Sequence, residues 1–204
     1  VLRTLGVAAG IVPRGGPVQV YGLDFGSGGL RALEQLPHVG AVIQGDDGER
    51  IIRLFRRIAG LLEDRAQRFA EANAANITEY RALSGNVNEP RILLLLDNYP
   101  SFRDEWESTL GRIPWYQVFR DILSEGRQLG IHVAMSADRP GSVPTNVSSS
   151  IQRRVVLRLA DEEEAGVDRG LLTGVTVVIT GTLEGFSRDQ ARAAVEDRGG
   201  KVSG

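Results

Sequence analysis

The sequence has 204 residues, of which 42% are hydrophobic and 25% charged, so it has the composition of a soluble globular protein with room for one large domain or one domain and a fragment. It contains no cysteine, which excludes disulfides, zinc ribbons and a thiol nucleophile, and its two histidines, His38 and His132, are too far apart in sequence to form a metal cluster alone. The formal net charge of −2 excludes a bulk basic field for nucleic acid, and the longest apolar run, residues 92–96, falls far short of the roughly 20 residues that cross a bilayer.

The N-terminal part of the chain predicts short alternating elements. In chain order these are the end of a helix over 1–9, a strand over 18–24, a short helix over 30–36 and a short strand over 39–43. The Pro- and Gly-rich residues 13–17 separate the first two. Asp24 closes the first predicted strand, and we interpret it as a structural carboxylate.

The longest predicted helix covers residues 46–72. Its apolar residues form one stripe: Ile51, Leu54, Phe55, Ile58, Leu61, Leu62 and Phe69. Asp46 or Asp47 is placed to cap its start. Arg53, Arg56 and Arg57 are interpreted as part of its solvated face.

The second half predicts an open α/β sheet. Further helices are expected over 77–83, 102–110 and 116–129, and further strands over 91–96, 131–136 and 154–159. The continuous apolar run before Asp97 is typical of a strand buried on both faces of a parallel sheet. Alternation of strands and helices at this spacing favours a parallel sheet covered by helices.

Asp97 and Asn98 are the candidate catalytic residues. A buried apolar strand that ends on a carboxylate has the form of a Walker B strand, whose Asp helps to hold Mg²⁺ beside the phosphates of a nucleotide. A strand-end cap is the alternative role for Asp97. The next residue is Asn98, which orients water but is a poor general base. The phosphate-loop pattern G-x-x-x-x-G-K-[ST] does not occur, and the glycine-rich residues 26–29 lack its Lys and hydroxyl.

Most of the chain resembles the FtsK/SpoIIIE translocase family, and especially its actinobacterial members, including the type VII secretion ATPases. The segments that carry the resemblance lie in the family's order: 21–26 with 36–40, 62–69, 130–140, 143–145 and 154–159. The similarity covers about residues 1 to 166. We assign residues 1–168 to an ATPase core without its phosphate loop and expect the chain to begin just after that loop.

The resemblance implies a RecA-like P-loop NTPase sheet with helices on both faces, truncated at its N-terminus. It also implies ATP and Mg²⁺ as cofactors and a hexameric ring that moves DNA or a secreted helical protein. Asp97 matches the Walker B Asp and is the expected metal and nucleotide residue. Asn98 departs from the family's catalytic Glu, and Asp138 replaces a sensor Gln. Arg139 is either a phosphate contact across a subunit interface or a structural residue.

Residues 169–204 resemble the start of a BRCT domain, such as the one that ends bacterial NAD-dependent DNA ligases. The similarity rests on residues 172–183, 186–188 and 199–202, which predict a partial β-α-β unit. In phosphate-binding BRCT domains the positions of Thr180, Gly181 and Arg188 contact phosphate. Ligase activity does not follow, because the catalytic domains of a ligase are absent from this sequence. We expect a fusion, or chimera, with its seam near residues 166–170.

Three functions are therefore expected. The first is a module of an ATP-driven translocase with impaired hydrolysis, and the second is a non-catalytic module that binds a secretion substrate or partner. The third is a fusion whose BRCT-like piece relates to DNA ligase and which has no native activity. We expect a cytoplasmic location, with a membrane contacted only through other parts of a parent protein.

Overall fold

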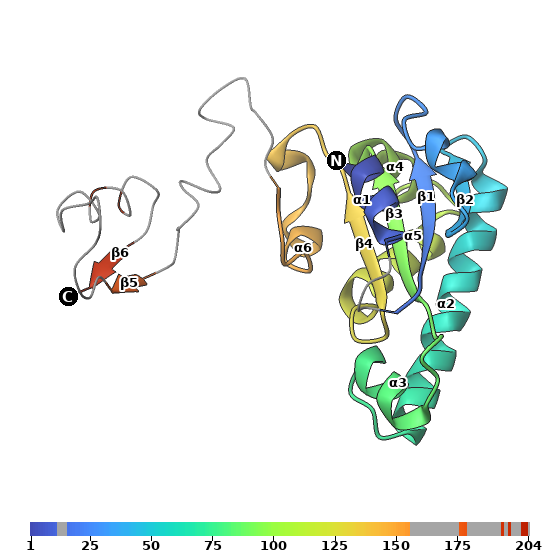
Figure 1. Cartoon of the computed structure of the whole chain (residues 1–204). Helices are drawn as coiled ribbons and strands as arrows, with labels where there is room; N and C mark the ends of the chain where they lie inside the picture. Colours follow the sequence, from blue (N-terminus) through green and yellow to red (C-terminus); the bar gives the residue numbers. More distant parts are fainter. Residues whose placement is uncertain (12–15, 156–175, 179–192, 194–195, 197–200, 204) are drawn as a thin grey trace. The chain divides into compact units, whose positions relative to one another are not determined.

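The computed structural model describes residues 1–11, 16–155, 176–178, 193, 196 and 201–203. The chain divides into two units, Val1–Gln152 and Arg153–Gly204. The first unit is built on a parallel sheet in the order β2-β1-β3-β4 (Figure 1). Its strands are β1 (Val18–Asp24), β2 (Val39–Gln44), β3 (Arg91–Asp97) and β4 (Ile131–Met135). This is the α/β sheet that the sequence predicts.

Helices cover both faces of this sheet. The described helices of the first unit are α1 (Leu2–Ala9), the 3₁₀ helix η1 (Arg31–Gln35), α2 (Gly48–Glu71), α3 (Ile77–Ser84), α4 (Tyr99–Trp106), α5 (Ile113–Glu125), the 3₁₀ helix η2 (Pro140–Ser142) and α6 (Thr145–Ser148). One face packs against α1 and η1, and the other against α2, α4 and α5 (Figure 1). None of the described helices is both long and apolar enough to cross a membrane.

The alternation of side chains along β3 explains its apolar run. Leu94 and Leu96 point into the larger core beneath α2, whereas Leu95 belongs to the smaller core beneath α1. All three are fully buried because both faces of the central strand are covered. Aromatic rings fill the larger core, where Phe102 packs edge-on against Phe119 with their centroids 5.0 Å apart.

The short helix predicted over 30–36 is present as a 3₁₀ helix over Arg31–Gln35. Three other helices differ from the prediction. Helices α4 and α5 begin earlier than expected, and each has a proline in its first turn, where the missing N–H costs nothing. The short helix α6 was not predicted, since four residues give too little periodicity to recognise.

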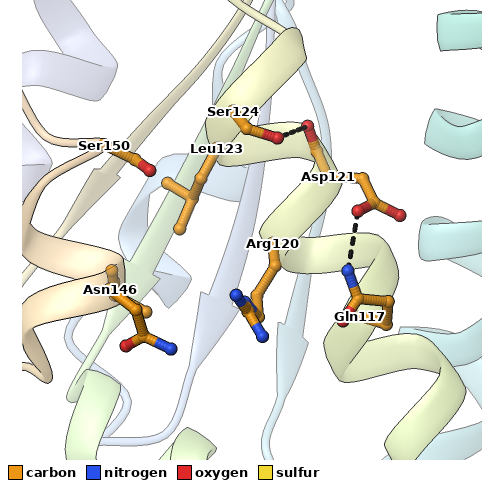
Figure 2. Close-up of a pocket in the computed structure, with 8 residues that line it drawn as sticks. Gln117, Arg120, Asp121, Leu123, Ser124, Asn146 and Ser150 are labelled. Atoms are coloured by element: carbon orange, nitrogen blue, oxygen red, sulfur yellow. Dashed lines mark hydrogen bonds between the residues drawn. The ribbon is translucent and has the colours of Figure 1, made fainter.

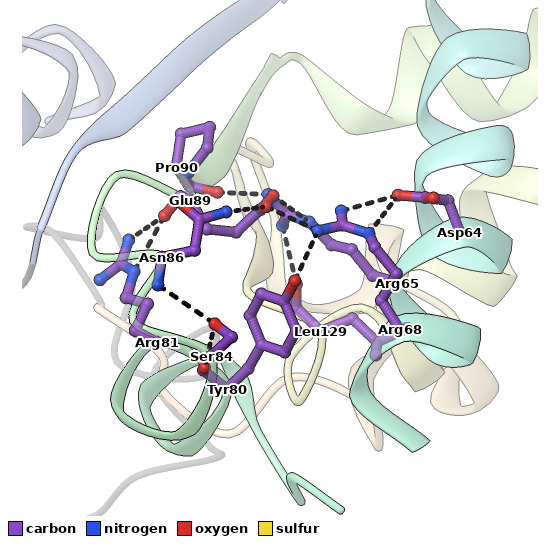
Figure 3. Close-up of polar contacts among 10 residues, drawn as sticks. All are labelled: Asp64, Arg65, Arg68, Tyr80, Arg81, Ser84, Asn86, Glu89, Pro90 and Leu129. Atoms are coloured by element: carbon purple, nitrogen blue, oxygen red, sulfur yellow. Dashed lines mark hydrogen bonds and ion pairs between the residues drawn. The ribbon is translucent and has the colours of Figure 1, made fainter. Parts of the chain in front are cut away.

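A buried ion-pair network ties α3 and the start of β3 to α2 (Figure 3). Arg65 donates to Glu89 Oε1 at 2.7 Å, and Arg68 donates to Glu89 Oε2 at 2.9 Å. Arg68 also donates to the Tyr80 hydroxyl, and Arg81 donates to the Glu89 carbonyl at 2.9 Å. The network fixes the C-terminal half of α2 against the sheet.

In the second unit, β5 (Thr176–Val178) pairs in parallel with β6 (Lys201–Ser203). Strand β5 lies within residues 172–183, where the sequence predicts the first strand of a β-α-β unit. Most of the strand predicted over 154–159, the boundary at 168 and the seam at 166–170 lie outside the described residues. Thr180, Gly181 and Arg188 lie outside them too, so their roles stay predictions.

Candidate functional site

The sheet has a switch point between β1 and β3, because the chain continues from β1 to β2 on one side and β3 lies on the other. Ligands of open α/β sheets bind at such points, outside the carboxyl ends of the strands. Asp24 and Asp97 are the last residues of the two strands and are partners in the register. The candidate site therefore begins with two neighbouring carboxylates.

Asp24 has a structural role, as predicted. Only 2% of it is exposed, and its carboxylate accepts the backbone N–H groups of Gly26 (3.1 Å), Gly28 (3.2 Å) and Leu30 (2.8 Å). The glycine-rich loop is thus folded inward onto Asp24. Those N–H groups are already used and cannot cradle a phosphate, so this loop does not replace a phosphate loop.

Asp97 is half-buried, and within the described part of the chain only one of its two carboxylate oxygens accepts a hydrogen bond. Its Oδ1 accepts the hydroxyl of Ser136 at 2.6 Å. Its Oδ2 has no hydrogen-bond partner among the described residues and faces Gly26, where an added Cβ would come within 2.5 Å of it. Glycine at position 26 therefore keeps this oxygen accessible.

Asn98 serves as the cap of α4. Its φ of 61° lies in the left-handed region, which Asn tolerates better than most residues. The side-chain amide donates to Ser101 Oγ at 2.8 Å and to the Phe25 carbonyl at 3.2 Å, and its oxygen caps the N–H of Ser101. These bonds use both N–H groups of the carboxamide and hold its oxygen toward the first turn of α4.

The other singled-out polar residues do not contact the Asp97 carboxylate within the described part of the chain. Arg139 is exposed and lies 4.0 Å from Asp138. His38 makes a hydrogen bond of 2.8 Å with the Gly6 carbonyl, which ties α1 to the loop before β2. Burial lowers the pKa of His132, and the positive charges of Arg91 and Arg127 add to this effect. His38 thus links α1 to the loop before β2, and His132 is a half-buried residue of β4.

The donor set fits one side of a Mg²⁺-nucleotide site. Among the described residues, no three His, Asp or Glu side chains gather to hold a metal. A single carboxylate such as Asp97 matches the way Mg²⁺ is held when phosphates and water supply its remaining ligands. No motif in the sequence supplies the lysine that would contact the phosphates, because Lys201 is the only lysine in the sequence.

Two cavities of the first unit lie away from Asp97. The cavity between α5 and α6 has a volume of about 90 Å³ and is lined by polar groups such as Arg120, Asp121 and Asn146 (Figure 2). Ligand pockets usually have roughly 300–1,000 Å³, so this one is too small for a nucleotide. A groove of about 370 Å³ lies between α2 and the first residues of β1 and β3, at the end of the strands opposite Asp97.

Sequence reasoning missed Ser136 and Gly26. Both act through their position beside Asp97 rather than through a recognisable motif. The rule that parallel strands end at the same sheet edge could have indicated Ser136, because it directly follows the strand beside β3. No spacing rule could have indicated Gly26, because its closeness to Asp97 depends on the path of the loop.

Solved structures share this fold. The cytoplasmic domain of EssC superposes with a TM-score of 0.71 at 26% identity, covering 81% of this chain and 31% of the other. The Thermomonospora curvata EccC ATPases 2 and 3, solved in complex with a signal sequence peptide, superpose with a TM-score of 0.63 at 30% identity, covering 73% of this chain and 27% of the other.

The curated proteins that are similar in sequence are secretion proteins as well. An ESX secretion system protein EccC from Thermomonospora curvata is 32% identical over 173 residues, which cover 82% of this chain and 13% of the relative. The ESX-4 secretion system protein EccC4 from Mycobacterium tuberculosis is 31% identical, with 92% and 15% covered. This chain thus spans a small part of the length of these relatives. Residues 2–179 match the FtsK/SpoIIIE family, and the chain therefore belongs to that family.

Proposed function

We propose that this chain is an ATPase-fold module of a type VII secretion translocase whose own nucleotide site binds Mg²⁺-ATP weakly and does not turn it over. The observation that carries the proposal is the pairing of Asp97, with one open carboxylate oxygen, and Asn98, whose carboxamide is bound to Ser101 and Phe25. The first residue fits a metal, whereas the second supplies no general base.

A secreted protein is the proposed cargo, in preference to DNA. The secretion relatives support this choice, and the net charge of −2 gives no basic field for a DNA backbone. We further propose that the parent acts in the cytoplasm as a ring of such modules, with Arg139 exposed for a neighbouring subunit. The BRCT-like nature of residues 169–204 and a fusion origin stay predictions.

When bound, Mg²⁺ would neutralise charge on the nucleotide's phosphates. Asp97 Oδ2 would hold it directly or through water, and Gly26 would leave room for it. Asn98 would keep the loop after β1 attached to the start of α4 through the Phe25 carbonyl. None of these residues removes a proton from water.

The test compares the 204-residue chain with its Asp97→Asn variant. Calorimetry with Mg²⁺-ATP should show affinity weaker than micromolar, and phosphate release should equal that of the variant, because no base is in place. Micromolar affinity together with turnover that Asp97→Asn abolishes would show that the site is an active ATPase.

The groove beside α2 supports a second function, recognition of a secretion signal. Tyr21, Ile58 and Ile92 are buried residues in its lining, and Arg57 and Asp64 are charged residues on its exposed side. An apolar lining with a few charges is typical of a site for a peptide side chain. The related EccC structure contains a signal sequence peptide, which supports a peptide as the occupant here.

Gly60 allows this function to be tested without disturbing the core. It lines the groove on α2 and has open space beside it, so Gly60→Gln fills the groove while improving helix propensity by about 0.5–1 kcal/mol. Fluorescence anisotropy with the signal sequence peptide of the EccC complex should show at least tenfold weaker binding to this variant. Ala66→Gln, on the exposed part of α2 outside the groove, should bind normally. Equal binding by both variants would show that the groove is not the site that binds the peptide.

A further inference from the structure

Ser136 lies directly after β4 and is fixed to the end of β3 by its backbone. Its N–H donates to the Leu96 carbonyl at 2.9 Å, and its carbonyl accepts the N–H of Tyr99 at 2.9 Å. These two bonds flank Asp97 and Asn98 in the chain. The Ser136 side chain is therefore held at a defined place beside the candidate metal residue.

The Ser136 hydroxyl makes two further bonds. It donates to Asp97 Oδ1 at 2.6 Å and accepts the N–H of Asn98 at 2.9 Å. Because the hydroxyl oxygen of Ser136 accepts the N–H of Asn98, its own proton points away from Asn98. Among the described residues, the carboxylate oxygen that this proton reaches is Asp97 Oδ1. A short O–H···O⁻ bond of this kind is among the stronger hydrogen bonds in proteins.

The consequence is that the two oxygens of Asp97 are not equivalent. Oδ1 is occupied by Ser136, whereas Oδ2 lies beside Gly26, which has no side chain to cover it. Rotation of the Asp97 side chain about its Cα–Cβ bond, to another χ1 rotamer, would break the Ser136 bond and move Oδ2 away from Gly26. A hydroxyl at position 136 thus selects one orientation of Asp97.

We propose that Ser136 is the positioning residue of this site: its hydroxyl fixes Asp97 so that Oδ2, beside Gly26, is the oxygen presented to a divalent cation. The part of this inference that concerns the cation rests on the proposed function. The part that concerns the orientation of Asp97 rests on the geometry alone. Partners that orient metal ligands typically change metal affinity about 10- to 100-fold when they are removed.

The first experiment measures the orientation of Asp97 without any ligand. Three-bond NMR couplings in the labelled 204-residue chain should report one χ1 rotamer for Asp97 in the wild type and averaged values in Ser136→Ala. Ser136→Thr keeps a hydroxyl and should restore the single rotamer. Ser108→Ala, at an exposed serine just after α4, should leave the couplings unchanged. A single rotamer in Ser136→Ala would overturn the proposal.

The second experiment uses Mn²⁺ alone as the probe. Paramagnetic broadening of the Phe25 and Gly26 amide signals should need at least tenfold more Mn²⁺ in Ser136→Ala than in the wild type, and Asp97→Asn should abolish it. Equal Mn²⁺ dependence in Ser136→Ala and wild type would overturn the role of Ser136 in cation binding. If the wild type shows no such broadening while the couplings behave as expected, the metal assignment in the proposed function fails and the orientation of Asp97 by Ser136 stands.

Discussion

Glu89 is a single carboxylate shared by two guanidinium groups. Burial raises its pKa, but the hydrogen bonds from Arg68 and Arg65 outweigh burial and hold the pKa of Glu89 below its usual value. Burial lowers the pKa of Arg65 even though Glu89 raises it, while the Glu89 hydrogen bond raises the pKa of Arg68. The opposite directions for the two arginines reflect their exposure, since the Arg65 side chain is fully buried and 30% of Arg68 is exposed.

A carboxylate with a lowered pKa stabilises the fold above the pKa of the unfolded chain, and this contribution is lost as pH falls through the folded value. Glu89→Gln should therefore reduce the free energy of unfolding by about 3–5 kcal/mol near neutral pH, because it leaves Arg65 buried without its counter-charge. The difference from wild type should shrink in acid as Glu89 itself is protonated. Urea unfolding at several pH values checks this, with the exposed Glu63→Gln as control. A difference that does not change with pH would contradict the assigned role.

At the candidate site, the sequence predicted Asp97 as the metal and nucleotide residue and Asn98 as the replacement of the family's catalytic Glu. Both predictions were possible because the two residues come at the end of an apolar strand that can be recognised without a structure. It did not predict what these side chains do. The capping of α4 by Asn98 depends on its left-handed backbone, and the occupation of Asp97 Oδ1 depends on the neighbouring strand. The second is a tertiary feature that no local pattern encodes, whereas the first is a local cap that can be assigned only once the start of α4 is known.

At the scale of elements, prediction succeeded where periodicity was long. Helix α2 has an apolar stripe over 24 residues and begins after its cap, Asp47, as expected. Strand β3 was recognised because burial on both faces leaves only apolar residues. Prediction was weaker at helix ends: the predicted helices begin after the prolines that lie in the first turns of α4 and α5. Strand order could not be derived either, since the placement of β1 between β2 and β3 comes from packing across the whole sheet.

At the scale of the whole molecule, the described cores lie within the first unit. The three clusters of buried apolar residues in the described part of the chain end at Ile151, and the unit itself ends at Gln152. A unit that contains its own sheet and core is expected to unfold cooperatively by itself. Arg153 and Arg154, which follow it, are exposed and offer trypsin a place to cleave.

Brief trypsin treatment of the 204-residue chain should therefore leave a fragment that begins at Val1 and ends at Arg153 or Arg154. A chain of residues 1–152 should show a single cooperative thermal transition by circular dichroism, and its midpoint should match that of the first transition of the longer chain. Both expectations follow from the core residues, because removing residues 153–204 takes away none of those clusters. If the shorter chain unfolds without cooperativity, residues beyond Gln152 are required for the fold, and the first unit is not independent.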